Sequence, residues 1–408
     1  MCGISAIYSG SNTHNSKDII FNLLKKLQHR GQDSYGYSDG NIVEKYIGLI
    51  KEKPKKLNGN IILGHTRYCT SGIVNLKMTQ PMKKGELTLI HNGNINNLFS
   101  DVSDTMSLLN FLNHYLRKDN IIEVIKKAIF HVEGSFFIIM IHNNNLYAFK
   151  DKNGTRPGLY GIDDNGNILI SSENNNYDTI NTDIMPGEIL EIKEDRIINK
   201  YQTFNDFRPC IFEYIYLSHP QTTIYGLKVK DFRTRIARSC VDLLTGIKIN
   251  VVCGVPNSSV DYGMEVARTL NKKYIEPFVK NKRSFILPTQ EEREKCVKDK
   301  FTFPEHLFEY DNVLIVDDSV IRGTTSKHLI KCFTDKGCKV TFLSCSPMVV
   351  NTNKLGINIT TKEELLSYKR NLQEMADYLG CEKIIYQTIE NLYKYSGFKK
   401  LELSMFKK

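Results

Sequence analysis

The sequence of 408 residues lacks any long apolar segment. Its longest apolar runs, such as residues 136–141 (FFIIMI), are far below the roughly 20 residues that a membrane-spanning helix needs. The N-terminus also lacks the series of basic region, apolar stretch and small-residue cleavage site that forms a secretory signal. We therefore expect a cytoplasmic protein with no membrane partner.

Metal-binding cysteine patterns are missing as well. The chain has 10 cysteines, but no two form a C-x-x-C pair and none belongs to a cysteine–histidine cluster with zinc spacing. Scattered thiols in a chain of this length indicate a reducing compartment. Nine of them are expected to be ordinary small apolar residues, and Cys2 is the exception because of its position.

Signatures of nucleic-acid binding are absent too. The formal net charge is +10, but lysines are interspersed with acids along most of the chain. Neither an aromatic-plus-basic RNA-binding pattern nor a recognition-helix pattern is present. A positive balance instead suits a small substrate that carries phosphate and pyrophosphate.

The first half of the chain predicts a layered α+β domain, because its strands and helices do not alternate regularly. Two apolar runs around an Asn-rich tip predict a hairpin at 134–150. Further strands are expected at 168–171 and 189–192. Helical periodicity predicts helices at 16–28, 104–117 and 121–130.

The second half predicts an α/β domain with a parallel sheet, because strand, loop and helix alternate there. Buried strands are expected at 250–253, 312–316 and 340–345, and helices at 262–270 and 325–333. The change in character comes near Arg208 and Pro209. We expect domains at 2–208 and 209–395, and a short C-terminal tail at 396–408.

Cys2 directly follows the initiator methionine. Removal of Met1 would leave one residue with both a thiol and a free α-amine. That amine, with a pKa of about 7.7–8.0, can accept the thiol proton without a histidine. The pair can attack a carboxamide and form a thioester. A cysteine at this position is usually accidental, so the interpretation depends on other residues.

Two charged residues suit the backbone groups of a bound amino acid. Arg67 ends the apolar run GHTRY, where its planar guanidinium could grip an α-carboxylate by two bonds. Asp104 begins a predicted helix and could pair with an α-ammonium group. Each has a plainer interpretation: a surface salt bridge for Arg67, and a helix cap together with Ser103 for Asp104.

Asn92 and Gly93 follow a predicted strand at 87–90. The Asn92 side chain and the Gly93 backbone N–H could form an oxyanion hole for a tetrahedral intermediate. A hairpin turn is the plainer interpretation of this pair. The order of these residues behind a Met-Cys-Gly start favours a site that hydrolyses the amide of glutamine.

A second constellation lies at 313–326 (VLIVDDSVIRGTTS). A buried strand ends in Asp317 and Asp318, and ligands of open α/β sheets bind beyond the carboxyl ends of strands. The two acids could hold ribose hydroxyls directly or through Mg²⁺. The small loop at 323–325 could surround a 5′-phosphate with N–H groups and hydroxyls. The plainer interpretation is an ordinary strand–turn–helix with a capped start.

The first half resembles the class II glutamine amidotransferases, which are N-terminal-nucleophile hydrolases with a four-layer αββα fold. The resemblance is carried by MCGI at the N-terminus, HRGQDSYG at 29–36, GHTRY at 64–68, HNGN at 91–94, SDTMSLL at 103–109 and KNGTRPGLYG at 152–161. It implies that Cys2 is the nucleophile and that Asn92 and Gly93 stabilise the oxyanion. It also implies that Arg67 and Asp104, with Gly93, hold glutamine.

The second half resembles the type I phosphoribosyltransferases, and VDDSVIRGTTS is typical of the amidophosphoribosyltransferase family. The resemblance implies a metal site at Ser259, Asp317 and Asp318 that takes Mg²⁺. It implies that phosphoribosyl pyrophosphate is bound by eight residues: Lys280, Asp317, Asp318, Ser319, Arg322, Gly323, Thr324 and Thr325.

This family transfers ammonia from glutamine to C1 of phosphoribosyl pyrophosphate, the first committed step of purine synthesis. The resemblance further implies a homo-oligomer, either dimer or tetramer, and purine nucleotides as inhibitors. The C-terminal cysteines of members with an iron–sulfur cluster are absent from the sequence, so no cluster is expected.

Other interpretations remain open at this point. The stretch after FVKN (278–281) is a few residues shorter than is usual in the family. A catalytically impaired or regulatory homologue would fit that difference, as would an enzyme that uses free ammonia because its two sites are uncoupled.

Overall fold

The structure is a computed structural model of the chain. It describes residues 1–10, 15–68, 75–99, 103–174, 177–194, 196–199, 206–276, 278–279, 301–302, 309–357, 359 and 361–407.

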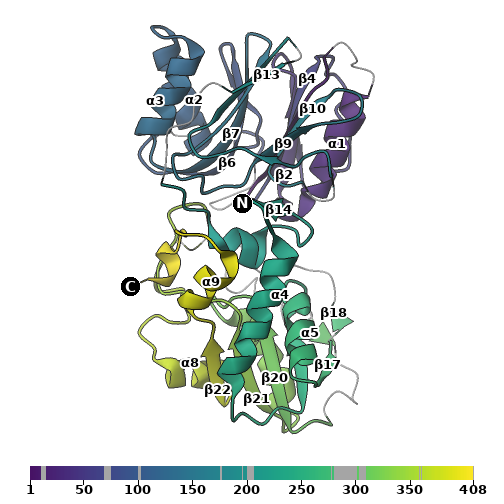
Figure 1. The fold of residues 1–408 in the computed structure, drawn as a ribbon, viewed down its shortest axis with the longest axis vertical. Coiled ribbons are helices and arrows are strands. Elements are labelled where there is room, and N and C mark those ends of the chain that lie inside the picture. The colour runs from purple at the N-terminus through teal and green to yellow at the C-terminus, as the bar shows by residue number, and fades with distance from the viewer. Residues whose placement is uncertain are drawn as a thin grey trace.

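Two antiparallel sheets form the centre of the N-terminal half (Figure 1). One has seven strands in the order β11 (Thr182–Asp183), β9 (Leu159–Ile162), β10 (Ile168–Ser171), β1 (Gly3–Tyr8), β4 (Ile61–Arg67), β2 (Ser34–Ser38) and β3 (Val43–Ile47). The other has six strands in the order β13 (Arg196–Asn199), β12 (Ile189–Lys193), β8 (Asn145–Lys150), β7 (Gly134–His142), β6 (Leu87–Ile95) and β5 (Met82–Lys84).

Helices cover the outer faces of both sheets. Helix α1 (Ser16–Lys26) packs on the seven-stranded sheet, and α2 (Asp104–Leu116) and α3 (Ile121–His131) pack on the six-stranded sheet. The result is the predicted αββα sandwich. The predicted hairpin is confirmed as β7 and β8, which pair antiparallel.

Strand β7 is apolar at successive positions because both of its faces are buried. Alternate side chains enter the core below α2 and α3: Phe136, Ile138 and Met140. The others enter the core between the two sheets: Phe137, Ile139 and Ile141. A continuous apolar run thus specifies a strand in the middle of a four-layer stack.

The second half contains a parallel five-stranded sheet, as predicted. Its order is β17 (Lys273–Ile275), β16 (Val251–Gly254), β20 (Asn312–Asp317), β21 (Lys339–Ser344) and β22 (Lys383–Tyr386). One face is covered by α4 (Val229–Cys240), α5 (Val260–Thr269) and α9 (Ile389–Ser396). The other is covered by α7 (Thr324–Thr334) and α8 (Leu372–Leu379).

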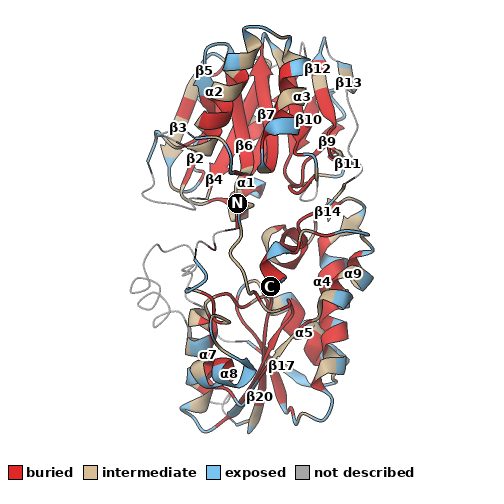
Figure 2. Cartoon of the chain, turned by 90° about the vertical axis from the view of Figure 1, so that its left-hand side faces the viewer, coloured by how far each residue is buried: buried red, intermediate tan, exposed pale blue. Residues whose placement is uncertain are grey.

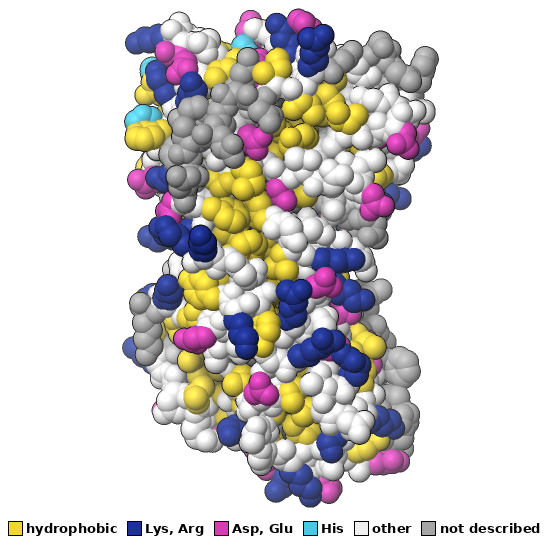
Figure 3. All heavy atoms as spheres, viewed as in Figure 1, with side chains coloured by type: hydrophobic (Ala, Val, Ile, Leu, Met, Phe, Trp, Pro, Cys, Tyr) yellow, Lys and Arg dark blue, Asp and Glu magenta, His cyan; other side chains and the backbone are white. Residues whose placement is uncertain are grey.

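Four short strands lie outside these sheets and form two separate pairs: β14 (Thr223–Ile224) with β15 (Leu227–Lys228), and β18 (Phe278–Val279) with β19 (Phe301–Thr302). No helix in the described ranges has both the length and the apolar character needed to cross a bilayer. On the face shown in Figure 3, lysine and arginine side chains are scattered over both halves, with acidic ones between them.

The segment predicted as a C-terminal tail packs into the second half (Figure 2). Leu401, Leu403, Met405 and Phe406 are buried in the same core cluster as Ile211. The Glu402 N–H also donates to the carbonyl of Pro209 at 3.0 Å. The C-terminal segment therefore packs against the first residues of the α/β domain.

The burial of the C-terminal segment should contribute to the stability of the α/β domain. We expect Leu403→Ala to destabilise the protein by about 2–5 kcal/mol, because it removes a buried side chain and leaves a cavity. The matched control is Leu372→Ala, since Leu372 is 52% exposed, and it should change stability by less than about 0.5 kcal/mol. Denaturant unfolding of the α/β domain measures both. Equal effects of the two variants would contradict the packing of the C-terminal segment.

Candidate active sites

The backbone of Cys2 is held on both sides. Its N–H donates to Asn92 Oδ1 at 3.1 Å, and its carbonyl accepts from Arg30 Nε at 3.0 Å. Gly3 pairs with Thr66, so the start of β1 lies next to the end of β4, where Arg67 is located. Two segments that are far apart in the sequence therefore meet at the nucleophile.

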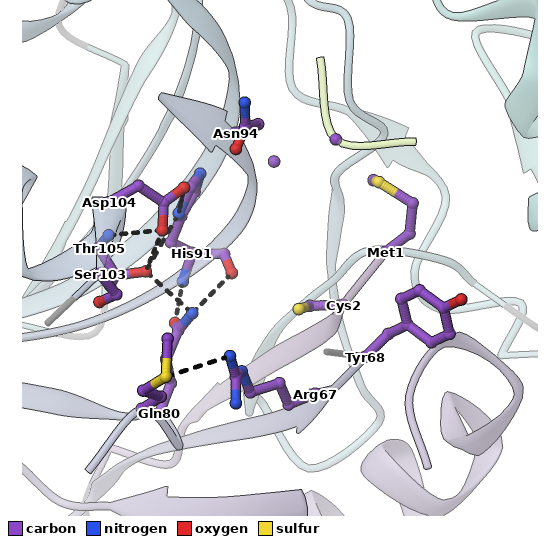
Figure 4. Close-up of a pocket in the computed structure, with 13 residues that line it drawn as sticks. Met1, Cys2, Arg67, Tyr68, Gln80, His91, Asn94, Ser103, Asp104 and Thr105 are labelled. Carbon is purple, nitrogen blue, oxygen red and sulfur yellow. Dashed lines mark hydrogen bonds and ion pairs between the residues drawn. The ribbon is translucent and has the colours of Figure 1, made fainter. Parts of the chain in front are cut away.

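Cys2 lines a cavity of about 180 Å³ (Figure 4). Cys2, Arg67, Gly93 and Asp104 all line it, so the structure brings the predicted glutamine residues together. The remaining lining residues are Met1, Tyr68, Met78, Gln80, His91, Asn94, Ser103, Thr105 and Gly356.

Arg67 places an unsatisfied guanidinium in this cavity. The residue is only 8% exposed, and its Nη1 atom is buried without a hydrogen-bond partner. Among the described residues, its Nη2 atom lies 4.0 Å from the sulfur of Met78. No acid among the described residues pairs with it, which argues against the surface salt bridge. A buried donor without a partner is costly, and a ligand carboxylate would satisfy it.

Asn92 and Gly93 lie within β6 and pair with β7, so they are not a hairpin turn. Asn92 is fully buried; its Oδ1 accepts from the Cys2 N–H, while its Nδ2 has no hydrogen-bond partner in the part of the chain that the structure describes. Gly93 has φ +150°, and a Cβ there would lie 1.9 Å from the carbonyl oxygen of Ser135. Only glycine fits this position, and Asn92 keeps a free donor beside the nucleophile.

Asp104 is the first residue of α2, but Ser103 provides the cap, since Ser103 Oγ accepts from the N–H of Met106 at 3.2 Å. The Asp104 carboxylate accepts from the N–H groups of Thr105 at 2.8 Å and Ile95 at 3.3 Å. Its side chain remains 30% exposed at the cavity. The carboxylate is therefore positioned by the backbone and open to a cationic ligand group.

Gln80 is a positioning residue that the sequence analysis missed. Its Oε1 accepts from the N–H of His91 at 2.7 Å, and its Nε2 donates to Thr105 Oγ1 at 3.1 Å. It thereby links β6 to α2 by two hydrogen bonds at the wall of the cavity. Burial lowers the pKa of His91, so that its imidazole stays neutral. Nothing in the residue pattern singles out Gln80.

A second omission is a buried ion network below Cys2. It consists of Arg30, Arg156, Glu173 and Glu213, each at most 4% exposed. Burial alone would raise the pKa of Glu213, but the two arginines more than offset that and hold it below its usual value. The motif HRGQDSYG at 29–36, which contains Arg30, contributes to the family resemblance, but it does not identify Glu173 and Glu213 as the partners of Arg30.

The second site lies at the carboxyl end of β20, where Asp317 and Asp318 meet Ser259. Ser259 Oγ is 2.7 Å from Asp317 Oδ1 and 3.0 Å from Asp318 Oδ2. Burial, followed by the charge of Asp318, raises the pKa of Asp317. Burial likewise raises the pKa of Asp318. The three residues that were predicted to share a metal site are therefore in contact.

The predicted phosphate loop directly precedes α7. Gly323 takes the left-handed conformation, with φ +77°, and Thr324 and Thr325 form the first helical residues. Ser319 Oγ donates to Asp318 Oδ1 at 2.8 Å, next to this loop. The loop, the acids and the helix N-terminus thus lie at one edge of the parallel sheet.

Arg322 is the predicted phosphate ligand with a strong protein partner. Its Nη2 is 2.6 Å from Glu364 Oε2, and its Nε donates to the same oxygen at 3.1 Å. This ion pair links the phosphate loop to the segment before α8. Lys280 lies outside the described residues.

Comparison with known proteins shows which family the chain belongs to. No protein-family model matches the chain. It is 34% identical to the amidophosphoribosyltransferase of Pasteurella multocida, over 96% of this chain and 88% of that protein. It is 32% identical to that of Methanocaldococcus jannaschii, over 99% and 96%.

The fold is also similar to that of a solved relative. The glutamine phosphoribosylpyrophosphate amidotransferase of B. subtilis, complexed with ADP and GMP, superimposes with a TM-score of 0.85. The sequence identity is 27%, over 99% of this chain and 96% of that chain. The identities to curated relatives over almost the whole chain show that it belongs to the amidophosphoribosyltransferase family.

Proposed function

We propose that the chain transfers ammonia from glutamine to C1 of 5-phosphoribosyl 1-pyrophosphate. The products are 5-phosphoribosylamine, glutamate and pyrophosphate. The observation that carries the glutaminase half is the cavity beside Cys2, where Arg67 Nη1 and Asn92 Nδ2 are buried donors without a protein partner.

In the first half-reaction Arg67 binds the α-carboxylate of glutamine, and Asp104 binds its α-ammonium. After Met1 is removed, the α-amine of Cys2 accepts the thiol proton, and the thiolate attacks the side-chain carbonyl. The N–H of Gly93 and the Asn92 side chain donate to the oxyanion. The stored proton passes to the leaving ammonia, and water then hydrolyses the thioester to glutamate.

Removal of Met1 has a second role in this proposal. The Met1 side chain lines the cavity, and a Cβ on Gly356 would lie 3.3 Å from its sulfur. Burial lowers the pKa of the Met1 amine to about 6. Processing therefore frees space for glutamine and places the amine on the residue that carries the thiol.

In the second half-reaction the loop at 323–325 binds the 5′-phosphate, assisted by Ser319 and by Arg322 through the pair with Glu364. Lys280 is proposed as a further ligand of phosphoribosyl pyrophosphate. Ammonia attacks C1, and pyrophosphate leaves. The ammonia must pass inside the protein, because water near pH 7 would convert it to ammonium.

The acidic edge suits Mg²⁺. Two carboxylates and the Ser259 hydroxyl converge there. Burial is the main cause that raises the pKa values of both carboxyl groups, and a bound cation would favour their ionised forms. In the described ranges, no group of three or more His, Cys, Asp or Glu side chains is arranged to hold a metal. Asp317, Asp318 and Ser259 would therefore share the ion with substrate oxygens. Bound Mg²⁺ would neutralise charge on the departing pyrophosphate.

Three further points belong to the proposal. The domains extend over 2–208 and 209–395, with the segment at 396–408 packed on the second. The chain forms homo-oligomers, either dimers or tetramers. Purine nucleotides inhibit it, a proposal supported by the nucleotides bound to the B. subtilis relative. The named relatives lend no support to a catalytically impaired or regulatory homologue.

The proposal predicts separate losses for the two halves. Cys2→Ala should lower glutamine-dependent pyrophosphate release at least about 1,000-fold, yet leave the rate with ammonium salts within about twofold of wild type. Cys332→Ala, which replaces another half-buried cysteine, should change neither rate. If glutamine-dependent activity persisted in Cys2→Ala, the assigned nucleophile would be wrong.

Arg67→Lys tests how glutamine is held. Lysine keeps the charge but loses the planar fork, so we expect kcat/KM for glutamine to fall by roughly 10- to 100-fold, mainly through a higher KM. The ammonium-dependent rate should not change. Arg196→Lys, at an exposed position of β13, is the matched control. An unchanged KM for glutamine in Arg67→Lys would argue against the carboxylate contact.

Asp317→Asn tests the ribose-phosphate site. It removes one of the paired charges, so pyrophosphate release should fall by on the order of 100-fold or more with glutamine and with ammonium alike. Asp335→Asn, at an exposed carboxylate after α7, is the control and should match wild type. Loss of only the glutamine-dependent rate in Asp317→Asn would contradict the proposed role of this acid.

A further inference from the structure

Glu213 is the only charged residue in an otherwise uncharged run at 210–217 (CIFEYIYL). It begins a five-residue π-helix, η2 (Glu213–Leu217), at the start of the second domain, and it is 1% exposed. A charge in such a place must be paired, because removing a carboxylate from water costs several kcal/mol. π-Helical turns also occur frequently at functional sites.

The partners of Glu213 come from the N-terminal domain. Its Oε1 and Oε2 atoms accept from Arg30 Nη2 and Nη1, both at 3.1 Å, in a bidentate pair. Its Oε1 also accepts from Arg156 Nη1 at 3.1 Å. Ser218 Oγ donates to Oε2 at 2.9 Å. One carboxylate of the second domain thus holds two arginines of the first.

Both arginines also contact the backbone at or next to residues that line the glutamine cavity. Arg30 donates through Nε to the carbonyl of Cys2 at 3.0 Å. Arg156 donates through Nε to Ser135 Oγ at 3.2 Å and through Nη2 to the carbonyl of Leu355. The next residue, Gly356, lines the cavity. Glu213 is therefore connected to Cys2 through the side chain of Arg30. It is connected to the segment of Gly356, which also lines the cavity, through the side chain of Arg156.

The π-helix is in turn fixed by the ribose-phosphate domain. Arg233 of α4 donates to the carbonyls of Tyr214 and Ser218, both at 2.8 Å. The hydroxyl of Tyr262 on α5 donates to the carbonyl of Ile215 at 3.0 Å. Helix α5 begins directly after Ser259, whose hydroxyl contacts the acidic pair. The π-helix that carries Glu213 is thus hydrogen-bonded to α5, the helix that starts at the second site.

We propose that Glu213 is a positioning residue of the glutaminase reaction, through which the second domain aligns Cys2. The carboxylate orients Arg30, Arg30 holds the Cys2 carbonyl, and Asn92 holds the Cys2 nitrogen on the other side. This inference rests on the proposed function. Displacement of a reacting group by about 1 Å can cost on the order of 100-fold in rate, so a small shift of Arg30 suffices.

Glu213→Gln tests this inference, because the amide keeps the size of the side chain but loses its charge and one acceptor. We expect the kcat of glutamine hydrolysis to fall by roughly 10- to 100-fold. The KM for glutamine should change less than about threefold, since Arg67 and Asp104 are untouched. Pyrophosphate release with ammonium salts should remain within about twofold of wild type.

Glu44→Gln is the matched control. Glu44 is also a buried carboxylate, 9% exposed, and it accepts from the N–H groups of Lys55 and Lys56 in the N-terminal domain. It makes no contact with the cavity residues, so both rates should match wild type. A general loss of stability from a buried Glu→Gln change would lower both rates in either variant.

A glutaminase kcat of Glu213→Gln within about twofold of wild type would overturn the inference, as would an equal loss of the glutamine- and ammonium-dependent rates. If the single variant fails to fold, Glu213→Gln with Arg156→Met decides by the same criteria. That pair of changes leaves Arg30 balanced by Glu173, 2.5 Å away. A wild-type protein that releases no glutamate from glutamine would instead refute the proposed function.

Discussion

Arg30 and Arg156 from one domain share the carboxylate of Glu213 from the other, and the arrangement of the two sites depends on this buried contact. Burying each of these charges costs several kcal/mol, which is offset only when every donor and acceptor is satisfied. Glu173 balances the second positive charge through Arg30. The network is complete in one arrangement of the two domains. Arg30 also contacts the carbonyl of Cys2, next to the N-terminus, which lies at the junction of the two halves in Figure 1.

Unlike the paired charges of this network, some polar groups in the glutamine cavity are buried without partners among the described residues. Arg67 Nη1 and Asn92 Nδ2 are buried without partners, although such donors are costly in a folded protein. The ion network below Cys2 contacts its carbonyl through Arg30, and under the proposed function the two donors in the cavity would bind glutamine. At the acidic edge of the second domain, burial raises the pKa values of Asp317 and Asp318, and the charge of Asp318 raises that of Asp317 further.

Periodicity and local motifs predict both folds, and the structure brings most of the predicted glutamine residues to one cavity. The run at 136–141 specifies a doubly buried strand, and the acids at 317–318 follow a strand that is recognisable by itself. The ion network could not be predicted in this way, because Arg30 and Glu213 are 183 residues apart and only the folded chain pairs them. The charged residue inside CIFEYIYL and the motif around Arg30 are local signs of the network, but neither identifies the partners. Gln80 offered no sign, since its role depends on the position of α2.

The most direct test of the account is to follow glutamate and pyrophosphate together from the Met1-processed protein with glutamine, phosphoribosyl pyrophosphate and Mg²⁺. The account predicts equal amounts of both products at all times, because ammonia formed at Cys2 is consumed at the ribose site. Glutamate released well in excess of pyrophosphate, or pyrophosphate formed without glutamate, would contradict the claim that one chain couples the two reactions.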